Sequence, residues 1–249
     1  MKKTKSKKFL LIRGSILLVI GLISLFCVIY FNLIKNDSNP FKDSNKISDA
    51  IKFKQEYESL NNIINKNGKN EYLKINIDKN NPMVYKTSKE IVDILKNGTG
   101  IIYLGFSKCP WCRNAVPALI DVAKNTKTKE IYYLDIYDIR NELVLDDNKN
   151  IITKKPGTTD YLDMVKLLND YLKPYDGLED ESIKRIYAPT IVFVKDGKVL
   201  KIHEGTVESH TNAKESLTKD QYNELKQIYT DAIGEVYNAN VCTNNKEGY

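Results

Sequence analysis

A chain of 249 residues that is 42% hydrophobic and 28% charged can form one substantial domain with accessory segments, and this composition excludes a largely disordered protein. The formal net charge of +6 arises in the first 13 residues, which contain six Lys and Arg residues and no acidic residue. The other 32 basic residues equal the 32 acidic residues in number. The rest of the chain is therefore formally neutral, which argues against nucleic acid as a partner.

The first predicted element is residues 14–34, an uncharged run of 21 mostly apolar residues behind the basic tail of residues 1–13. As an α-helix it would be roughly 31 Å long, close to the thickness of a bilayer's hydrocarbon core, so we predict one transmembrane helix. Basic segments stay in the cytoplasm, and the chain after this helix should lie outside the membrane. We expect a retained anchor, because a cleaved signal peptide has a shorter apolar run and a small-residue cleavage site. A lipid-modified Cys27 is less consistent with the bulky Phe26 before it.

A polar tether containing one proline is predicted for residues 35–46. The extracytoplasmic domain should span residues 47–238, and a tail of residues 239–249 follows. The domain opens with a predicted helix in which Ser48 is the candidate N-cap. The apolar residues at helical spacing in this segment are Ile47, Ile51, Tyr57, Leu60, Ile63 and Ile64. Residues 72–77 then alternate in polarity as a strand does.

Helices and strands alternate in the next part of the domain. Thr87 with Glu90 three residues later forms the capping-box pattern of a helix start, and this helix should end at Gly98. An apolar strand, a cysteine-containing helix with Pro117 inside it, and a second apolar strand at residues 130–138 follow. This alternation predicts a βαβ unit in an α/β domain, with a mixed central sheet covered by helices on both faces.

Residues 138–187 form an insert of looser pattern, with one predicted helix at residues 158–172 between polar loops. Two apolar runs around an Asp-Gly pair at residues 196–197 then give a strong hairpin signal. An amphipathic helix that opens at Ser216 or Thr218 closes the domain. The insert could recognise a partner or could cap the edge of the sheet, and its sequence favours neither role over the other.

Cys109 and Cys112 stand two residues apart where the apolar strand should meet the following helix. Unpaired backbone N–H groups and the helix dipole favour negative charge at a helix start, so the pKa of Cys109 should be low and its thiolate should be the nucleophile. Cys112, almost one turn further, should be the resolving thiol that forms a redox disulfide with it. Pro110 suits the first helical position because it lacks an N–H. Trp111 should lie exposed as an apolar contact for a substrate chain.

Two other interpretations of the cysteine pair are weaker. A zinc site needs further ligands, and the two histidines, His203 and His210, are spaced more widely than zinc-binding pairs. An inert structural disulfide across so short a loop would constrain little of the unfolded chain. We therefore predict neither a metal nor a cofactor. Cys27 is interpreted as a lipid-facing residue, and Cys242 as either a free thiol or a partner in an intermolecular disulfide.

In this arrangement the chain resembles the thioredoxin superfamily, over roughly residues 72–235 without the insert. The matching features are the apolar strand of residues 101–106, the centre Cys109-Pro110-Trp111-Cys112, Pro117 five residues later, and the segment of residues 187–207 with Pro189. The resemblance implies a thioredoxin-like fold with a cis peptide bond between Ala188 and Pro189, and backbone contacts from these two residues to a substrate polypeptide beside the sulfurs. Proline admits a cis bond far more readily than other residues do. A trans proline at the start of a strand is the alternative.

The chain also departs from the thioredoxin pattern. Thioredoxin carries a buried acid six residues before its first cysteine, where this chain has Tyr103. The pair between the cysteines is Gly-Pro in thioredoxin and Pro-Trp in this chain. The Pro-Trp pair is closer to that of glutaredoxin-type centres. Lys108 and Arg113 flank the motif and should favour the thiolate, although such side chains are more often simply solvated. Through its predicted anchor and its Cys-Pro-x-Cys centre followed by Arg113, the chain resembles the bacteriocin-transport accessory proteins of Gram-positive bacteria.

The sequence therefore predicts a single-pass membrane protein whose extracytoplasmic domain exchanges disulfides with secreted or membrane polypeptides. A membrane redox partner is a candidate for recycling the dithiol. The direction of the reaction depends on the relative stability of two redox states, and residue patterns do not reveal it. The alternative is a non-catalytic, tethered accessory or scaffold protein of an export system, in which the cysteine pair is structural and the insert is a docking surface.

Overall fold

The computed structural model describes residues 47–64 and 71–237 of the chain. The chain divides into two units, and the second begins at Ile47. The predicted basic tail, transmembrane helix, tether and C-terminal tail lie outside the described residues, as do Cys27 and Cys242. No helix in the described part of the chain is both long and apolar enough to cross a membrane.

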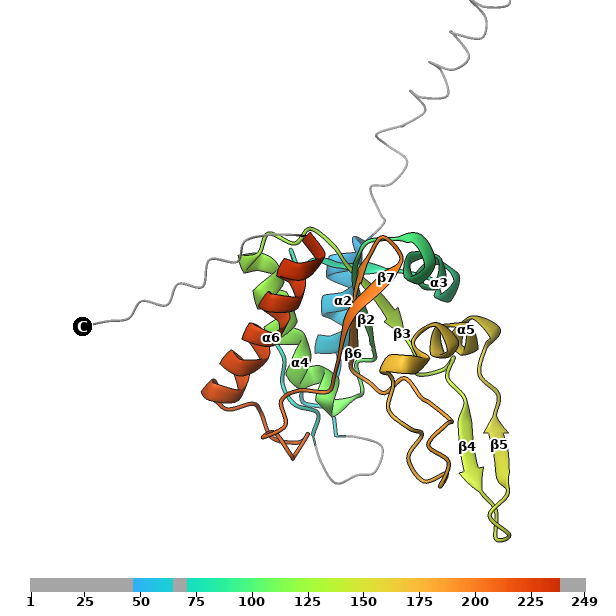
Figure 1. Cartoon of the computed structure of the whole chain (residues 1–249). Coiled ribbons are helices and arrows are strands. Elements are labelled where there is room, and N and C mark those ends of the chain that lie inside the picture. Colours follow the sequence, from blue (N-terminus) through green and yellow to red (C-terminus); the bar gives the residue numbers. More distant parts are fainter. Residues whose placement is uncertain (1–46, 65–70, 238–249) are drawn as a thin grey trace, which may run out of the picture. The chain divides into compact units, whose positions relative to one another are not determined.

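The second unit is built on a mixed five-stranded sheet with helices on both faces (Figure 1). In spatial order the strands are β1 (Met83–Tyr85), β3 (Ile131–Asp135), β2 (Gly100–Gly105), β6 (Thr190–Lys195) and β7 (Lys198–Glu204). β1, β3 and β2 are parallel, whereas β6 is antiparallel to β2 and β7 is antiparallel to β6. The helices are α2 (Asp49–Glu58), α3 (Ser88–Asn97), α4 (Pro110–Asn125), α5 (Thr159–Leu167), the short 3-10 helix Asn169–Tyr171, and α6 (Lys219–Tyr237). The predicted α/β class with a mixed sheet is confirmed, and the arrangement is consistent with a thioredoxin-like fold.

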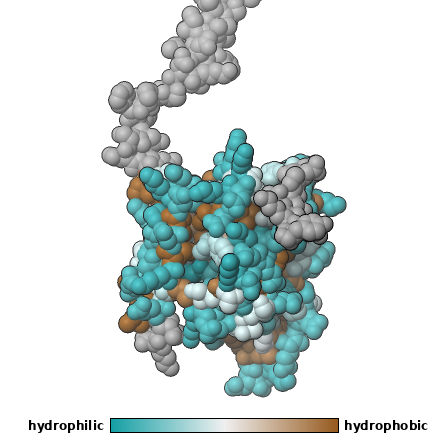
Figure 2. All heavy atoms as spheres, turned by 90° about the vertical axis from the view of Figure 1, so that its left-hand side faces the viewer, coloured by the Kyte–Doolittle hydropathy of each residue, from teal (hydrophilic) through white to brown (hydrophobic). Residues whose placement is uncertain are grey.

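The central strand β2 is buried along its whole length because both of its faces pack against helices. Successive side chains of a strand point to opposite faces. Ile101 and Tyr103 accordingly pack with α2, α4 and α6, whereas Ile102 and Leu104 pack with α3 and α5. Burial on both faces explains why the strand reads as a continuous apolar run. The outer face of the domain seen in Figure 2 is mainly hydrophilic, with apolar residues scattered in small patches.

Local signals placed several element ends correctly. α3 begins with the predicted capping box, in which the Thr87 hydroxyl accepts from the Glu90 N–H and the Glu90 carboxylate accepts from the Thr87 N–H. α6 begins after Thr218, whose hydroxyl accepts from the N–H of Gln221 at 3.3 Å. The predicted hairpin joins β6 to β7, and both residues of its turn, Asp196 and Gly197, have positive φ angles of 50° and 71°.

The first helix differs from its prediction. α2 has the predicted N-cap, since the Ser48 hydroxyl accepts from the Ile51 N–H, but the helix ends at Glu58, and Phe53 and Tyr57 are its buried residues. The isoleucines of the predicted apolar face are exposed: Ile47, Ile51, Ile63 and Ile64. The helix packs on the sheet through the two aromatic rings. The predicted apolar face was wrong because the isoleucines at helical spacing are exposed and two of them, Ile63 and Ile64, lie beyond the end of the helix.

Residues 72–77 do not form a strand of the sheet, which corrects the prediction. Ile75 and Ile77 are buried, as the alternation predicted, but their backbone groups bond to side chains instead of to another strand. The Asn61 amide donates to the Ile75 carbonyl at 2.8 Å and accepts from its N–H at 3.0 Å. The Glu58 carboxylate accepts from the Ile77 N–H at 2.7 Å. Alternating polarity thus predicted which side chains are buried but not what pairs with the backbone. The strand β1 was missed.

The insert contains two different structures. α5, which is shorter than predicted, begins after the N-cap Thr158, and its residues Tyr161 and Met164 are buried with α3 against the β2 and β6 side chains. The second structure is a separate antiparallel ribbon of β4 (Glu142–Leu145) and β5 (Ile151–Lys155), which extends away from the central sheet (Figure 1). The sequence predicts polar loop at these residues, so the prediction is wrong for the ribbon. The helical part of the insert therefore covers one face of the sheet, and the ribbon does not.

Candidate dithiol active site

Cys109 and Cys112 lie where β2 ends and α4 begins, as the sequence predicted. Cys109 is the N-cap of α4 and Pro110 is its first residue. The Cys109 N–H donates to the Phe106 carbonyl at 3.1 Å, which closes the turn between strand and helix. Both cysteines are free thiols, and their exposed fractions are 6% for Cys109 and 0% for Cys112. Any partner that reacts with the pair must therefore approach from the side of Cys109.

Hydrogen bonds to the sulfur of Cys109 lower the pKa of this thiol. The largest contribution is a hydrogen bond from the Cys112 thiol, and the backbone N–H groups of Cys112 and Trp111 and the charge of Arg140 act in the same direction against the opposing effect of burial. The Cys112 N–H donates to this sulfur at 3.4 Å. The predicted contribution of the helix start is therefore present, but the neighbouring thiol contributes more.

The pKa of Cys112 shifts in the opposite direction. Complete burial raises it, since a charged sulfur would lose its water, and the hydrogen bond to Cys109 and its charge raise it further. A hydrogen bond from the Tyr103 hydroxyl partly opposes this rise. One helical turn thus holds a sulfur whose pKa is lowered near the surface and a sulfur whose pKa is raised beneath it. Paired groups whose pKa values are driven apart are typical of sites that divide a nucleophilic and a proton-bearing role.

The loop before β6 lies directly against the first sulfur. The Ala188–Pro189 peptide bond is cis, as predicted. In its thiol form Cys109 donates to the Ala188 carbonyl at 3.2 Å. β6 begins at the next residue, where Thr190 pairs with Leu104 of β2. Antiparallel pairing of β6 with β2 therefore brings residues 188 and 189 to the same end of the sheet as the dithiol.

Trp111 is half-buried, which corrects the prediction that it is exposed. Its ring meets that of His210 edge to face at a centroid distance of 5.2 Å. The His210 ring is itself fixed, because Nδ1 lies 2.9 Å from the Thr206 hydroxyl and Nε2 lies 3.1 Å from the Glu215 carbonyl. A carbonyl only accepts, so Nε2 carries a hydrogen. The loop between β7 and α6 therefore holds the tryptophan in place, a contact that no spacing in the sequence indicated.

Arg113 does not act on the Cys109 thiolate as its position beside the motif predicts. It is only 2% exposed, and the groups that lower the pKa of Cys109 do not include it. Its guanidinium donates to the carbonyls of Leu73 (2.6 Å), Tyr57 (2.8 Å) and Ser107 (3.3 Å) and to the side chain of Asn61 (2.7 Å). Burial lowers the pKa of Arg113. The residue ties the end of α2 and the following segment to the helix that carries the cysteines.

Arg140, at the start of the insert, is the cation that acts on the first sulfur, and no pattern in the sequence indicates this role. Its guanidinium lies 4.9 Å from the ring centre of Phe106, the residue that closes the turn before Cys109. Its charge lowers the pKa of Cys109. Lys108, one of the two expected cations, instead lies 5.5 Å from the ring centre of Tyr137.

Replacing Arg140 by glutamine should raise the pKa of Cys109 and slow its reaction with iodoacetamide at neutral pH. The loss should stay below about fivefold, because Arg140 is partly exposed, its charge is the smallest of the named causes of the shift, and such a cation contributes about 1 kcal/mol or less. Lys108→Gln removes a neighbouring charge that is absent from the causes of the shift and should leave the rate nearly unchanged. Equal effects of the two substitutions would show that Arg140 has no special role.

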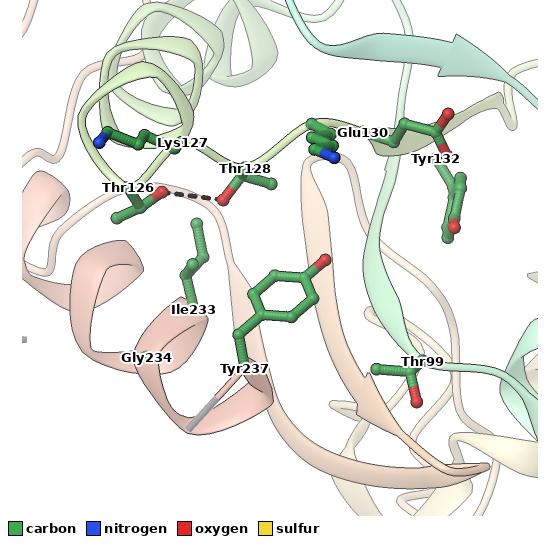
Figure 3. Close-up of a pocket in the computed structure, with 10 residues that line it drawn as sticks. Thr99, Thr126, Lys127, Thr128, Glu130, Tyr132, Ile233, Gly234 and Tyr237 are labelled. Carbon is green, nitrogen blue, oxygen red and sulfur yellow. Dashed lines mark hydrogen bonds between the residues drawn. The ribbon is translucent and has the colours of Figure 1, made fainter. Parts of the chain in front are cut away.

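A cavity of about 630 Å³ lies at the opposite end of α4, beyond its C-cap Thr126 (Figure 3). It is lined by Thr99, Thr126, Lys127, Thr128, Lys129, Glu130, Tyr132, Ile233, Gly234 and Tyr237. None of the residues predicted for the site belongs to this lining. Within residues 47–64 and 71–237, no three side chains of His, Cys, Asp or Glu gather as metal ligands would.

No model of a known protein family matches this chain, and a search of curated proteins finds no relative. The interpretation of the site therefore depends on the geometry described above. The described residues show an α/β fold, consistent with a thioredoxin-like arrangement, with a Cys-x-x-Cys pair at the start of a helix.

Proposed function

We propose that this chain is a thiol-disulfide oxidoreductase that exchanges disulfides with polypeptides. The observation that carries the proposal is the opposite behaviour of two sulfurs one helical turn apart. The pKa of Cys109 is lowered at the surface of the site, and that of Cys112 is raised beneath it. An inert structural pair has no need of this division, whereas an exchange reaction needs a nucleophile that is ionised first and a resolving thiol that ionises later.

In the proposed reaction the Cys109 thiolate attacks one sulfur of a substrate disulfide. The substrate S–S bond breaks, the displaced sulfur leaves with the electron pair, and a mixed disulfide forms at Cys109. Cys112 then loses its proton to the displaced substrate sulfur and attacks Cys109. The mixed disulfide breaks, the second substrate sulfur leaves as a thiolate, and a Cys109–Cys112 disulfide remains. The substrate is thereby reduced by two electrons, and the reverse sequence oxidises it.

A polypeptide is the substrate class that the surroundings of Cys109 favour. The Ala188 carbonyl lies 3.2 Å from the attacking sulfur, beside the start of β6. By resemblance to the thioredoxin superfamily, the backbone of Ala188 and Pro189 would bind an extended substrate segment there. Trp111 would supply an apolar contact, at the position where His210 holds its ring.

We also propose a cellular location for the chain. Residues 14–34 would anchor the chain in the cell membrane, and the basic tail before them would remain in the cytoplasm. The dithiol domain would then work outside, where soluble cytosolic systems do not keep thiols reduced. A membrane redox partner would recycle the pair. The cell would be that of a Gram-positive bacterium, because the chain resembles the bacteriocin-transport accessory proteins in its Cys-Pro-x-Cys centre and predicted anchor.

The experiment that tests the proposal is the replacement of Cys112 by serine in the full membrane-bound chain. Without the resolving thiol the mixed disulfide should persist, so covalent adducts of Cys109 should accumulate at least tenfold over wild type, by the logic of the two-step exchange. Non-reducing electrophoresis of thiol-blocked cells detects them, and a reductant should remove them. All chains in this experiment carry Cys27→Ala and Cys242→Ala, so that neither of these cysteines forms adducts, and the matched control is Cys109→Ser/Cys112→Ser in the same background. Adducts that survive in this control, or an absence of adducts in both, would contradict the proposal.

One observation favours the alternative function, a tethered scaffold of an export system. The ribbon of β4 and β5 leaves Ile151 and Ile152 exposed by 40% and 46%, and it packs on neither core cluster. Exposed apolar side chains on a projecting ribbon are suited to docking. The Cys109→Ser variant distinguishes the two functions, because a scaffold keeps its activity after this change and an oxidoreductase loses it.

A further inference from the structure

Two cations and two aromatic rings form a compact cluster beside the dithiol. The Arg140 guanidinium lies 4.9 Å from the ring centre of Phe106 and 5.6 Å from that of Tyr137. The two rings contact each other at a centroid distance of 5.1 Å, and the Lys108 ammonium lies 5.5 Å from the ring centre of Tyr137. We call these four residues the Arg140 cluster.

The topology of the sheet brings this cluster to the end at which Cys109 lies. β2 and β3 are parallel neighbours, and their last residues pair with each other. The segments that follow the two strands therefore leave the sheet at the same end. The first segment carries Phe106, whose carbonyl accepts from the Cys109 N–H at 3.1 Å. The second segment carries Tyr137 and Arg140, so the ring contacts join it to the turn that holds the nucleophile.

The guanidinium of Arg140 has unused hydrogen-bonding capacity. A guanidinium carries five N–H donors in a planar fork. Arg140 is partly exposed, and none of its donors has a hydrogen-bond or ion-pair partner among the residues that the structure describes. Its contacts within the cluster are with two aromatic rings. Such contacts orient the guanidinium and leave N–H groups available for other partners.

Two carboxylates follow in the same segment, and neither neutralises the cations of the cluster. The Asp135 carboxylate accepts from the Tyr137 N–H at 2.7 Å, and Asp138 is exposed. Within the described ranges, neither acid forms an ion pair with Arg140 or Lys108. The planar donor beside the nucleophile is therefore available to a ligand from outside the domain.

A carboxylate is the ligand that matches this donor best. A guanidinium can bind a carboxylate through two parallel N–H···O hydrogen bonds, a geometry that an ammonium does not offer. In the proposed reaction, the molecule that arrives beside Cys109 is a polypeptide. The carboxylate would then belong to an Asp or Glu side chain close to the substrate disulfide.

We propose that Arg140 is a specificity-determining residue that binds an acidic side chain of the substrate polypeptide near the disulfide that Cys109 attacks. The rings of Phe106 and Tyr137 orient the guanidinium for this contact. This inference rests on the proposed oxidoreductase function and names a substrate class for it, namely polypeptides with acidic residues beside the reactive cysteine.

The test uses three synthetic peptides of equal length, each with one cysteine joined to 2-thiopyridine through a disulfide. The two residues on each side of this cysteine are all glutamate, all glutamine or all lysine. The Cys109 thiolate attacks the peptide sulfur and the S–S bond breaks. The 2-thiopyridine leaves with the electron pair, takes a proton from water and is measured by its absorbance. The full chain carries Cys27→Ala and Cys242→Ala, so that only the pair responds.

The parent chain should react about fivefold faster with the glutamate peptide than with the glutamine peptide, which is the scale of a partly exposed ion pair. It should react most slowly with the lysine peptide. Each rate is divided by the rate of the same peptide with dithiothreitol, which corrects for the intrinsic reactivity of the peptide disulfide.

Arg140→Gln should remove the preference for the glutamate peptide. The effect of Arg140 on the pKa of Cys109 cancels in the ratio of the two rates, because the same thiolate attacks both peptides. Arg140→Lys should keep only part of the preference, because an ammonium lacks the planar fork.

Two lysines serve as controls. Lys127→Gln removes the same charge just beyond the C-cap of α4, at the opposite end of the helix, and should leave the ratio unchanged. Lys108→Gln removes the other cation of the cluster and should keep most of the preference. Equal rates with the glutamate and glutamine peptides in the parent chain would overturn the inference. So would a preference that survives Arg140→Gln, or one that Lys108→Gln removes equally. If the parent chain releases 2-thiopyridine from none of the peptides, the proposed function fails instead.

Discussion

Replacing Cys109 by serine should lower the rate of disulfide exchange by roughly a thousandfold or more, the scale seen when a nucleophile is removed from a set of groups that act together. A serine hydroxyl is not ionised at neutral pH. Cys112 cannot take over the attack, because it is fully buried and its pKa is raised. The rate is measured as reduction of a polypeptide disulfide by the full chain in the presence of dithiothreitol.

The same substitution should leave the fold almost unchanged. Cys109 is the N-cap of α4, and its sulfur accepts from the Cys112 N–H at 3.4 Å. Serine is among the best N-cap residues, so the free energy of unfolding should change by no more than about 0.5 kcal/mol. A stable variant without activity would show that the loss is chemical. A variant that keeps exchanging disulfides would contradict the assignment of Cys109 as the nucleophile.

The wild-type protein should show the lowered pKa of Cys109 directly. A free thiol has a pKa of about 8.5, and its alkylation slows as the pH falls below that value. The alkylation rate of Cys109 should instead decline at a lower pH than that of a free thiol, because its thiolate binds a proton only at that lower pH. Cys112 should stay unreactive over the same interval because its pKa is shifted upward. Mass spectrometry of the alkylated peptide distinguishes the two cysteines.

Replacing Arg113 by methionine should lower the free energy of unfolding by about 3 kcal/mol or more, which lies in the tail of single-residue effects. Methionine preserves much of the side-chain stem but has no donor, and it leaves three carbonyls and the Asn61 side chain without their common partner. Buried acceptors that lose a charged donor are costly. Urea unfolding of the full chain in detergent, followed by the fluorescence of the single tryptophan, Trp111, measures the loss.

Two further variants serve as controls for Arg113. Arg113→Lys keeps the charge but offers three donors on one nitrogen, so it should recover only part of the lost stability. Lys108→Met removes an exposed cation five residues earlier and should change the free energy of unfolding by no more than about 0.5 kcal/mol. If Arg113→Met is as stable as Lys108→Met, the guanidinium contacts contribute nothing to the fold.

Features with a local cause could be predicted from the sequence. The capping box at Thr87 and Glu90, the apolar strand β2, and the cysteine pair at the start of α4 each depend on residues a few positions apart. The cis bond before Pro189 came from the resemblance to thioredoxins, because 79 residues separate Ala188 from Cys109 and no spacing connects them. These features account for the position of the dithiol in the fold.

The rest of the site depends on contacts that only the folded chain creates. Phe106 and Tyr137 lie in different segments and read separately as ordinary aromatic residues. Arg113 looked like a solvated cation because the sequence does not show that three carbonyls converge on it. Arg140 acts on Cys109 from an insert that resembled loop. These roles depend on which distant segments meet in the folded chain. The strand period of two residues and the helix period of 3.6 residues carry no information about such contacts.

The β4–β5 ribbon can vary during evolution because the chain is closed at the base of the ribbon. The Thr158 N–H donates to the Ile139 carbonyl at 2.9 Å, so the chain has already closed on itself where the ribbon leaves the domain. Residues 142–155, which lie between these two positions and do not include Arg140, are an excursion whose length the sheet does not constrain. A ribbon of another length or sequence could replace it while α5 continues to cover the sheet. Recognition of a different polypeptide partner could therefore evolve through a changed ribbon, without any change in the chemistry of the sulfurs.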